Sequence, residues 1–161
     1  MAGGSTADLC KIMGAAVAQV AAQAEISINH TQQVTDRVAE CATLVSRRVA
    51  DARHGTPADI RAAEYHARQA RLSARRTDER AEETMQAAHL TRDVIERVRQ
   101  LANSDNPRLG ELQAAMDEAI RAAIRADRAA RLARIQMWKG AHAAIEAAQI
   151  RDVLDLVVPS E

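Results

Sequence analysis

The sequence is almost devoid of aromatic side chains: it has one tryptophan, one tyrosine and no phenylalanine in 161 residues. Compact cores and small-molecule pockets depend on large aromatic and aliphatic side chains. Hydrophobic residues still make up 47% of the chain, and alanine, the strongest intrinsic helix former, is the most common of them. This composition favours long helices and argues against a small-molecule substrate.

Proline and glycine are also scarce, and signals that break a helix occur together at only two internal places. In residues 53–59, Gly55 can end a helix and Thr56 can cap the next one, with Asp59 three residues after the cap. The second break is the turn-forming stretch 103–107, which ends in a proline. The two breaks divide the chain into three segments of nearly equal length.

The chain has only two cysteines, Cys10 and Cys41, which would lie roughly 46 Å apart on one straight helix. That distance excludes a disulfide between them, so reduced thiols and a cytoplasmic location are expected. The apolar run after Lys11, residues 12–22, loosely resembles a signal peptide, but Asp8 offsets the charge and the run has a polar interruption. No continuous apolar run is long enough to predict a transmembrane segment.

Neither sign of charge is in excess, because 22 Lys and Arg residues balance 22 Asp and Glu residues. A neutral chain has no overall field that would draw it to nucleic acid or to an anionic membrane. Only two of the basic residues are lysines, and this preference for arginine suggests a bacterial protein with a GC-rich genome.

Apolar and small residues recur at alternating steps of three and four in all three segments, the pattern of a helix with one buried stripe. The sequence therefore predicts an all-α fold: one domain, 1–161, forming an elongated antiparallel bundle of three long helices at about 6–53, 57–102 and 107–157. The bundle is expected to be coiled-coil-like with alanine-rich seams, a flexible start at 1–5 and turns near 54–56 and 103–106. In the first segment the predicted seam is Met13, Val17, Val20, Ala24, Ser27, Thr31, Val34, Val38, Cys41, Val45, Arg48 and Ala52. In the second it is Ile60, Ala63, Ala67, Ala70, Ala74, Thr77, Ala81, Thr84, Ala88, Thr91, Ile95, Val98 and Ala102. In the third it is Leu109, Leu112, Met116, Ala119, Ala123, Ala126, Ala130, Ala133, Met137, Gly140, Ala144 and Ala147, with a slip at Arg151 before Leu154.

A polar patch around Asn29 and His30 leaves one alternative for the fold. If the first helix breaks there, the chain forms four helices in place of three.

Both aromatic residues and three large aliphatic ones fall outside the predicted seams. Matching heights across the second turn places them near one end of the bundle, so we expect a partner-binding or self-association surface. Self-association would suit thin alanine seams, because a second bundle could pack alongside. The alternative is that the seams are rotated and these residues fill a wider core. The predicted surface consists of Trp138, Tyr65, Leu72, Ile135 and Ile145.

Arginines also recur at helical spacing, and their planar side chains suit phosphate groups. Acidic residues are interleaved closely enough to neutralise most of this charge, and base-stacking aromatics are absent, so nucleic-acid binding is not favoured. The possible polyanion-binding residues are Arg121, Arg125, Arg128, Arg131, Arg134, Arg75 and Arg76.

The residues that could support catalysis or metal binding are sparse. His142 and Glu146 share a helix face, and His66 and Cys41 are expected at a similar height, but the Glu-x-x-His motif of carboxylate metal sites does not occur. Nucleophile and phosphate-loop motifs do not occur either. We expect no metal, no cofactor and no enzymatic activity.

The tripeptide Trp138-Lys139-Gly140 resembles the Trp-x-Gly motif of the small helical-hairpin proteins exported by type VII secretion systems. In that family the motif lies at the hairpin turn, whereas here it falls within a predicted helix. The chain also resembles, in general pattern, bacterial scaffolding coiled coils, receptor rods and granule-coating phasins. The resemblance of the tripeptide to the type VII family implies a small secreted helical protein as one alternative function.

The predicted function is a non-enzymatic scaffold or adaptor that self-associates or binds a helical partner. A polyanion-binding or a lipid- or granule-surface protein is the other alternative, in which an amphipathic helix or the arginines make the contact.

Overall fold

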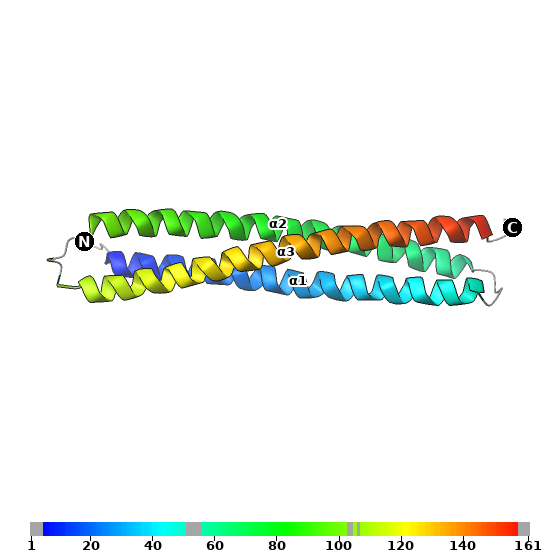
Figure 1. The fold of residues 1–161 in the computed structure, drawn as a ribbon, viewed down its shortest axis with the longest axis horizontal. Helices are drawn as coiled ribbons and strands as arrows, with labels where there is room; N and C mark the ends of the chain where they lie inside the picture. The colour runs from blue at the N-terminus through cyan, green and yellow to red at the C-terminus, as the bar shows by residue number, and fades with distance from the viewer. Residues whose placement is uncertain (1–4, 51–55, 103–104, 106, 158–161) are drawn as a thin grey trace. The chain divides into compact units, whose positions relative to one another are not determined.

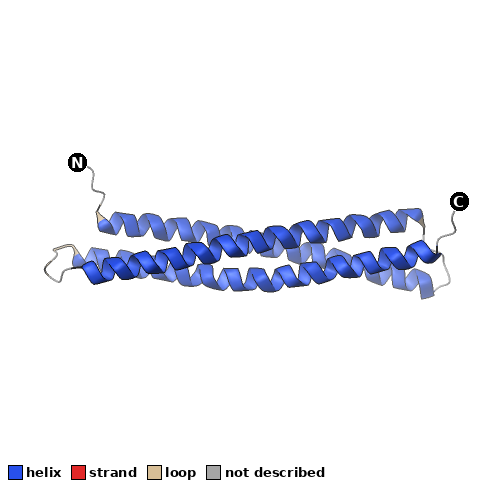
Figure 2. Ribbon diagram, turned by 90° about the horizontal axis from the view of Figure 1, so that it is seen from above, coloured by secondary structure: helices blue, strands red, loops and turns tan. Residues whose placement is uncertain are grey.

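The computed structural model describes residues 5–50, 56–102, 105 and 107–157. It contains three α-helices: α1 (Thr6–Ala50), α2 (Pro57–Leu101) and α3 (Leu109–Val157) (Figure 1). Every regular element in the described part of the chain is a helix (Figure 2). The all-α, three-helix prediction is confirmed, and the helix bounds agree with it to within a few residues. Most of the predicted flexible start and of the two predicted turns lies outside the described residues.

Two helices begin with reciprocal caps, and the one at Thr56 and Asp59 is the cap that the sequence predicts. The Ser5 N–H donates to Asp8 Oδ2 at 3.2 Å, and the Asp8 N–H donates to Ser5 Oγ at 3.2 Å. Thr56 and Asp59 exchange the same pair of bonds at the start of α2, at 3.0 Å and 3.3 Å. Reciprocal capping of this kind satisfies backbone donors that have no partner inside the helix.

The polar patch around Asn29 and His30 does not interrupt α1, which runs unbroken from Thr6 to Ala50. The four-helix alternative is therefore wrong. Thr31, next to the patch, is buried. Its hydroxyl is hydrogen-bonded to Ser73 and Thr77 of α2, so this part of α1 packs against α2.

The contacts divide the chain into two compact units, each built from part of every helix. Unit 1 comprises Met1–Ile26 and Glu79–Ala133, and unit 2 comprises Ser27–Asp78 and Arg134–Glu161. In each unit α1 and α3 run parallel to one another and antiparallel to α2, as the order of the core contacts shows.

The core of unit 1 changes character along its length. One cluster holds its large side chains, among them Ile95, Leu112 and Met116, together with Cys10. Burial raises the pKa of the Cys10 thiol, so the thiol stays protonated. The next cluster is almost entirely alanine, with Val17 as its one larger side chain.

The core of unit 2 combines an alanine and valine cluster with a layer of hydroxyl groups. The cluster consists of Val34, Val38 and five alanines of α2 and α3. In the layer, Thr31 Oγ1 lies 2.6 Å from Ser73 Oγ and 2.7 Å from Thr77 Oγ1. The Thr77 hydroxyl also donates to the Ser27 carbonyl oxygen, at 3.3 Å. These bonds tie α1 to α2 at one level.

The predicted seams of α2 and α3 are buried except at five half-buried positions, Ile60, Val98, Ala102, Leu109 and Met137. The seam of α1 is partly wrong, and its predicted positions Val45, Arg48 and Ala52 lie outside the described side chains. In unit 1 the buried positions include Cys10, Gly14 and Ala21, whereas Met13 and Val20 are only half-buried. The cause is the close approach of α1 and α3: a Cβ added at Gly14 would lie 3.2 Å from the Ala119 Cα. Large apolar side chains do not fit on so narrow a line of contact, and small residues take their place.

Candidate protein-interaction surface

Three large apolar side chains of α3 in unit 2 lie on its outer face. Ile135, Trp138 and Ile145 are all exposed, and 63% of Trp138 is accessible to solvent. At 100° per residue, Trp138 points about 180° away from the buried line that includes Ala133 and Gly140. The alternative in which Trp138 fills a wider core is therefore wrong. We call Ile135, Trp138 and Ile145 the α3 stripe.

Spacing within the α3 stripe is that of a helix seam. From Ile135 to Trp138 and on to Ile145 the positions fall on alternating steps of three and four, with His142 occupying the intervening position. Charged neighbours flank the stripe, including Arg134 and Glu146. An apolar line with polar edges matches the geometry by which one helix packs against another.

Tyr65 and Leu72 are exposed as well, but they lie on a different outer face. Both point about 180° away from the buried residues of α2, such as Ala67 and Ala74. Since α2 and α3 both turn their buried faces toward one core, their outer faces diverge. Matching heights along the helices placed these residues at similar levels but did not give their directions, so the convergence expected from the sequence is not found.

Heights matched across the second turn place Trp138 level with Leu72, and the structure differs from this by about one helical turn. A Cβ on Gly140 would lie 3.2 Å from Ala74 Cβ, which brings these two positions to one level. Trp138 is then level with the region of Arg76, about a turn away from Leu72.

The Trp138-Lys139-Gly140 motif lies in the middle of α3, with helix on both sides. Gly140 is buried against Thr31 and Ala74, so the glycine serves helix packing. In the described structure the tripeptide does not mark a turn, which is where the type VII family carries it.

The arginines form no continuous free belt. Arg125 donates two hydrogen bonds to Glu25, at 3.1 Å and 2.9 Å, and these bonds raise the pKa of Arg125. Arg131 pairs with Asp127 at 3.1 Å, and Arg75 and Arg134 also have partners. Arg121, Arg128 and Arg76 are exposed. The interleaved acidic residues thus occupy much of the charge that a polyanion would need.

Of the side chains considered for metal binding, Cys41 and His66 lie close together and His142 does not join them. Cys41 and His66 line the same groove of unit 2, of about 240 Å³, together with Asp59 and Glu40. The exposed His142 is not among the lining residues. Within the described residues no group of His, Cys, Asp or Glu is arranged to hold a metal ion.

The exposed face of α1 in unit 1 is a feature that sequence reasoning missed. Leu9, Ile12 and Ile26 are exposed, and no charged residue lies between Lys11 and Glu25. The segment Thr6–Leu44 is apolar and long enough to cross a membrane by length and composition alone, and 28% of its most apolar window is buried. Core helices and signal sequences share that property. The sequence shows that α1 has no charged residue between Lys11 and Glu25. The predicted seam, however, places Met13 and Val20 in the core, although both are only half-buried.

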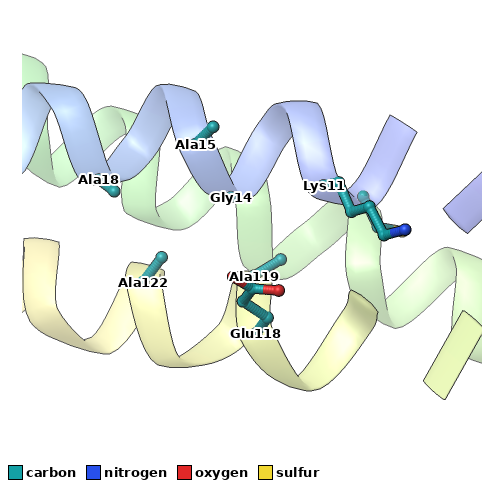
Figure 3. Close-up of a pocket in the computed structure, with 8 residues that line it drawn as sticks. Lys11, Gly14, Ala15, Ala18, Glu118, Ala119 and Ala122 are labelled. Carbon is teal, nitrogen blue, oxygen red and sulfur yellow. The ribbon is translucent and has the colours of Figure 1, made fainter. Parts of the chain in front are cut away.

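A shallow groove borders this face, between α1 and α3 of unit 1 (Figure 3). Its volume is about 330 Å³. Small residues form most of its walls, and Lys11 and Glu118 stand on its two sides (Figure 3).

No protein-family model matches the chain, and no curated protein or solved structure shows significant similarity to it.

Proposed function

We propose that this chain is a non-enzymatic interaction module that binds a helix of a partner protein along the α3 stripe. The observation that carries the proposal is the exposure of Trp138 between two exposed isoleucines at seam spacing. Tryptophan contributes more than most residues to binding free energy when it is buried in an interface. A partner helix that covers this exposed apolar line would remove its apolar surface from water, which favours binding.

Tyr65 and Leu72 provide a second, smaller apolar line on the outer face of α2. The two lines face different directions, so they would contact different helices. In this account the module connects helical partners, as a scaffold or adaptor does.

Polyanion binding is less well supported, because ion pairs within the chain already engage Arg125 and Arg131. Retention on heparin that falls steeply with salt would favour it over the present proposal. Export by a type VII system is also less well supported, because the Trp-x-Gly tripeptide is helical here.

Covalent capture from the stripe tests the proposal. A photoreactive phenylalanine analogue replaces Trp138 in cells that express the chain, and the cross-linked products are identified by mass spectrometry. We expect a discrete adduct whose yield falls at least tenfold when Ile145→Asp is added. The same analogue at the exposed Leu90 of α2, in unit 1, is the matched control and should not give that adduct.

Trp138→Ala should weaken association by a factor of about 30 or more, because hot-spot tryptophans contribute about 2 kcal/mol or more to binding. Its helicity by circular dichroism should equal that of the parent, because the side chain does not contribute to the core. An adduct that is insensitive to Ile145→Asp, or association unchanged by Trp138→Ala, would contradict the proposal.

A further inference from the structure

Along α1 and α3 of unit 1, the groove lies between two ion pairs that join the two helices. At one end Lys11 Nζ lies 3.6 Å from Glu111 Oε1. At the other end Arg125 donates to Glu25 at 2.9 Å. Between them the groove is lined by the small residues of Figure 3.

The two ion pairs have opposite polarity. At the first end the positive charge is on α1 and the negative charge is on α3, whereas at the second end the signs are exchanged. The separation of the charges is the same on both helices, about four helical turns or roughly 21 Å. All four side chains are substantially exposed, so they can contact a second molecule without leaving their partners.

Exchanged polarity is the pattern that an antiparallel pair of identical surfaces requires. Consider a two-fold axis that lies in the interface plane and runs perpendicular to the helices. It places α1 against the partner copy's α1, with the two helices antiparallel. Lys11 of one copy then lies opposite Glu25 of the other copy, and Glu111 lies opposite Arg125. With equal polarity at both ends, like charges would meet.

We propose that this face of unit 1 is the contact surface of a homodimer in which two copies pack antiparallel across the groove. The small residues Ala15 and Ala18 line the groove and allow the partner's helix to approach closely. The buried Gly14 lets α1 and α3 lie close together beneath them. The exposed Ile12 and Ile26 lie on the uncharged outer face of α1, at the edge of the contact. The face is small for a stable dimer, so the dimer should dissociate on dilution.

The proposal goes beyond the proposed function, because it uses unit 1 and leaves the α3 stripe of unit 2 open. A lipid surface is the competing occupant of the uncharged face. Surface-bound helices commonly carry a row of basic residues beside the apolar face, and Lys11 is the only basic residue of α1 in unit 1. The charge pattern therefore favours a second copy of the chain.

Glu118 gives the arrangement an internal check. It lies midway between Glu111 and Arg125, so the two-fold axis brings it near its counterpart in the second copy, where like charges oppose the contact. Glu118→Gln should therefore tighten the dimer several-fold. Helices packed parallel would not bring the two glutamates together, and the substitution would then have no such effect.

A swap of one ion pair tests the proposal without changing composition or net charge. Lys11→Glu with Glu111→Lys keeps the pair within each copy but gives both ends the same polarity. In sedimentation equilibrium we expect the dissociation constant of the dimer to rise at least tenfold. Adding Glu25→Arg with Arg125→Glu reverses the second end as well and should restore the parent affinity.

The matched control is Arg80→Glu with Glu83→Arg, which swaps an exposed ion pair of α2 at 2.8 Å. It should leave the dimer unchanged, and circular dichroism should show equal helicity for all variants. A monomer at every concentration, or a dimer indifferent to the Lys11 and Glu111 swap, would overturn the proposal. Co-sedimentation of the chain with neutral phosphatidylcholine vesicles would also overturn it and would assign the face to lipid.

Discussion

A hydrogen atom in place of a methyl group sets how closely α3 approaches its neighbours at Gly140. A Cβ at this position would lie 2.8 Å from Thr31 Cγ2 and 3.2 Å from Ala74 Cβ. Both distances are shorter than ordinary van der Waals contact, and the first requires a neighbour to move. Glycine has a poor helix propensity, but the packing of unit 2 at this position leaves no room for a side chain.

Gly140→Ala should destabilise the chain although alanine is the better helix former. The gain in propensity is about 1 kcal/mol, and overpacking costs about 1 to 3 kcal/mol. We expect a net loss in the free energy of unfolding, measured by urea denaturation. Gly110→Ala is the control, because nothing lies within 4 Å of its added Cβ. A stabilising Gly140→Ala would show that the contact with Thr31 is wrong.

Gln136 is a second residue at which the local environment makes a sharp prediction. Its side chain is buried, and its Nε2 has no hydrogen-bond partner among the described atoms. Burying such a group costs about 1 to 3 kcal/mol. Gln136→Leu should raise the free energy of unfolding by about 1 kcal/mol, whereas Gln149→Leu at an exposed position of α3 should change it by less than about 0.5 kcal/mol. A destabilised Gln136→Leu variant would indicate that the amide has a partner in solution.

At the scale of the element, the buried faces of α2 and α3 were predictable and that of α1 was only partly so. Along α2 every predicted seam position from Ala63 to Ile95 is buried, because most charged residues of α2 lie on its other faces and mark the seam clearly. In unit 1, α1 carries apolar or small residues on all sides. Choosing the larger ones, Met13 and Val20, as the seam missed the close contact at Gly14.

The hydroxyl layer gives α1 and α2 a fixed register. An alanine seam is nearly uniform along its length, so a shift by one heptad would bury similar surface. The bonds from Thr31 to Ser73 and Thr77 exist in one register only. Polar groups buried in a helix seam can select one alignment in this way.

Thr31→Val should lower the free energy of unfolding by about 1 to 2 kcal/mol, since it leaves the Ser73 hydroxyl without its partner in the core. The shape of the side chain is kept, so the loss reports the hydrogen bonds. Thr43→Val is the control, because the Thr43 hydroxyl is exposed and donates to the Ala39 carbonyl oxygen of its own helix. Equal stabilities of the two variants in urea denaturation would argue against the layer.

At the scale of the whole molecule, the two units have different exposed surfaces. Unit 1 presents the uncharged face of α1 and a groove with exchanged end charges. Unit 2 presents the α3 stripe around Trp138. In our proposals the first surface joins two copies and the second binds a helix of another protein. A dimer would carry two stripes and bind a multivalent partner more tightly than a single copy.

The sequence predicted which residues of the candidate site are exposed but not how they are grouped. Trp138 and Tyr65 are predicted to be exposed because they lie outside the seam of their helix. The seam is a property of one helix and can be read from its sequence. Whether two helices present Trp138 and Tyr65 on one face depends on the angle of each helix about the common core. That angle requires contacts such as the one between Gly140 and Ala74. The interhelical pairing of Glu25 with Arg125 likewise depends on tertiary structure.

The most direct test measures the mass of the chain by light scattering and the emission of Trp138 on the same sample. Trp138 is the only tryptophan, so its emission reports one position. The account predicts a concentration-dependent mass between that of one chain and that of two. It also predicts the red emission of a solvent-exposed indole in the purified chain at every dilution. Blue-shifted emission from a dilute, monomeric chain would contradict the account, because Trp138 would then be buried within its own bundle and the α3 stripe would not be a surface.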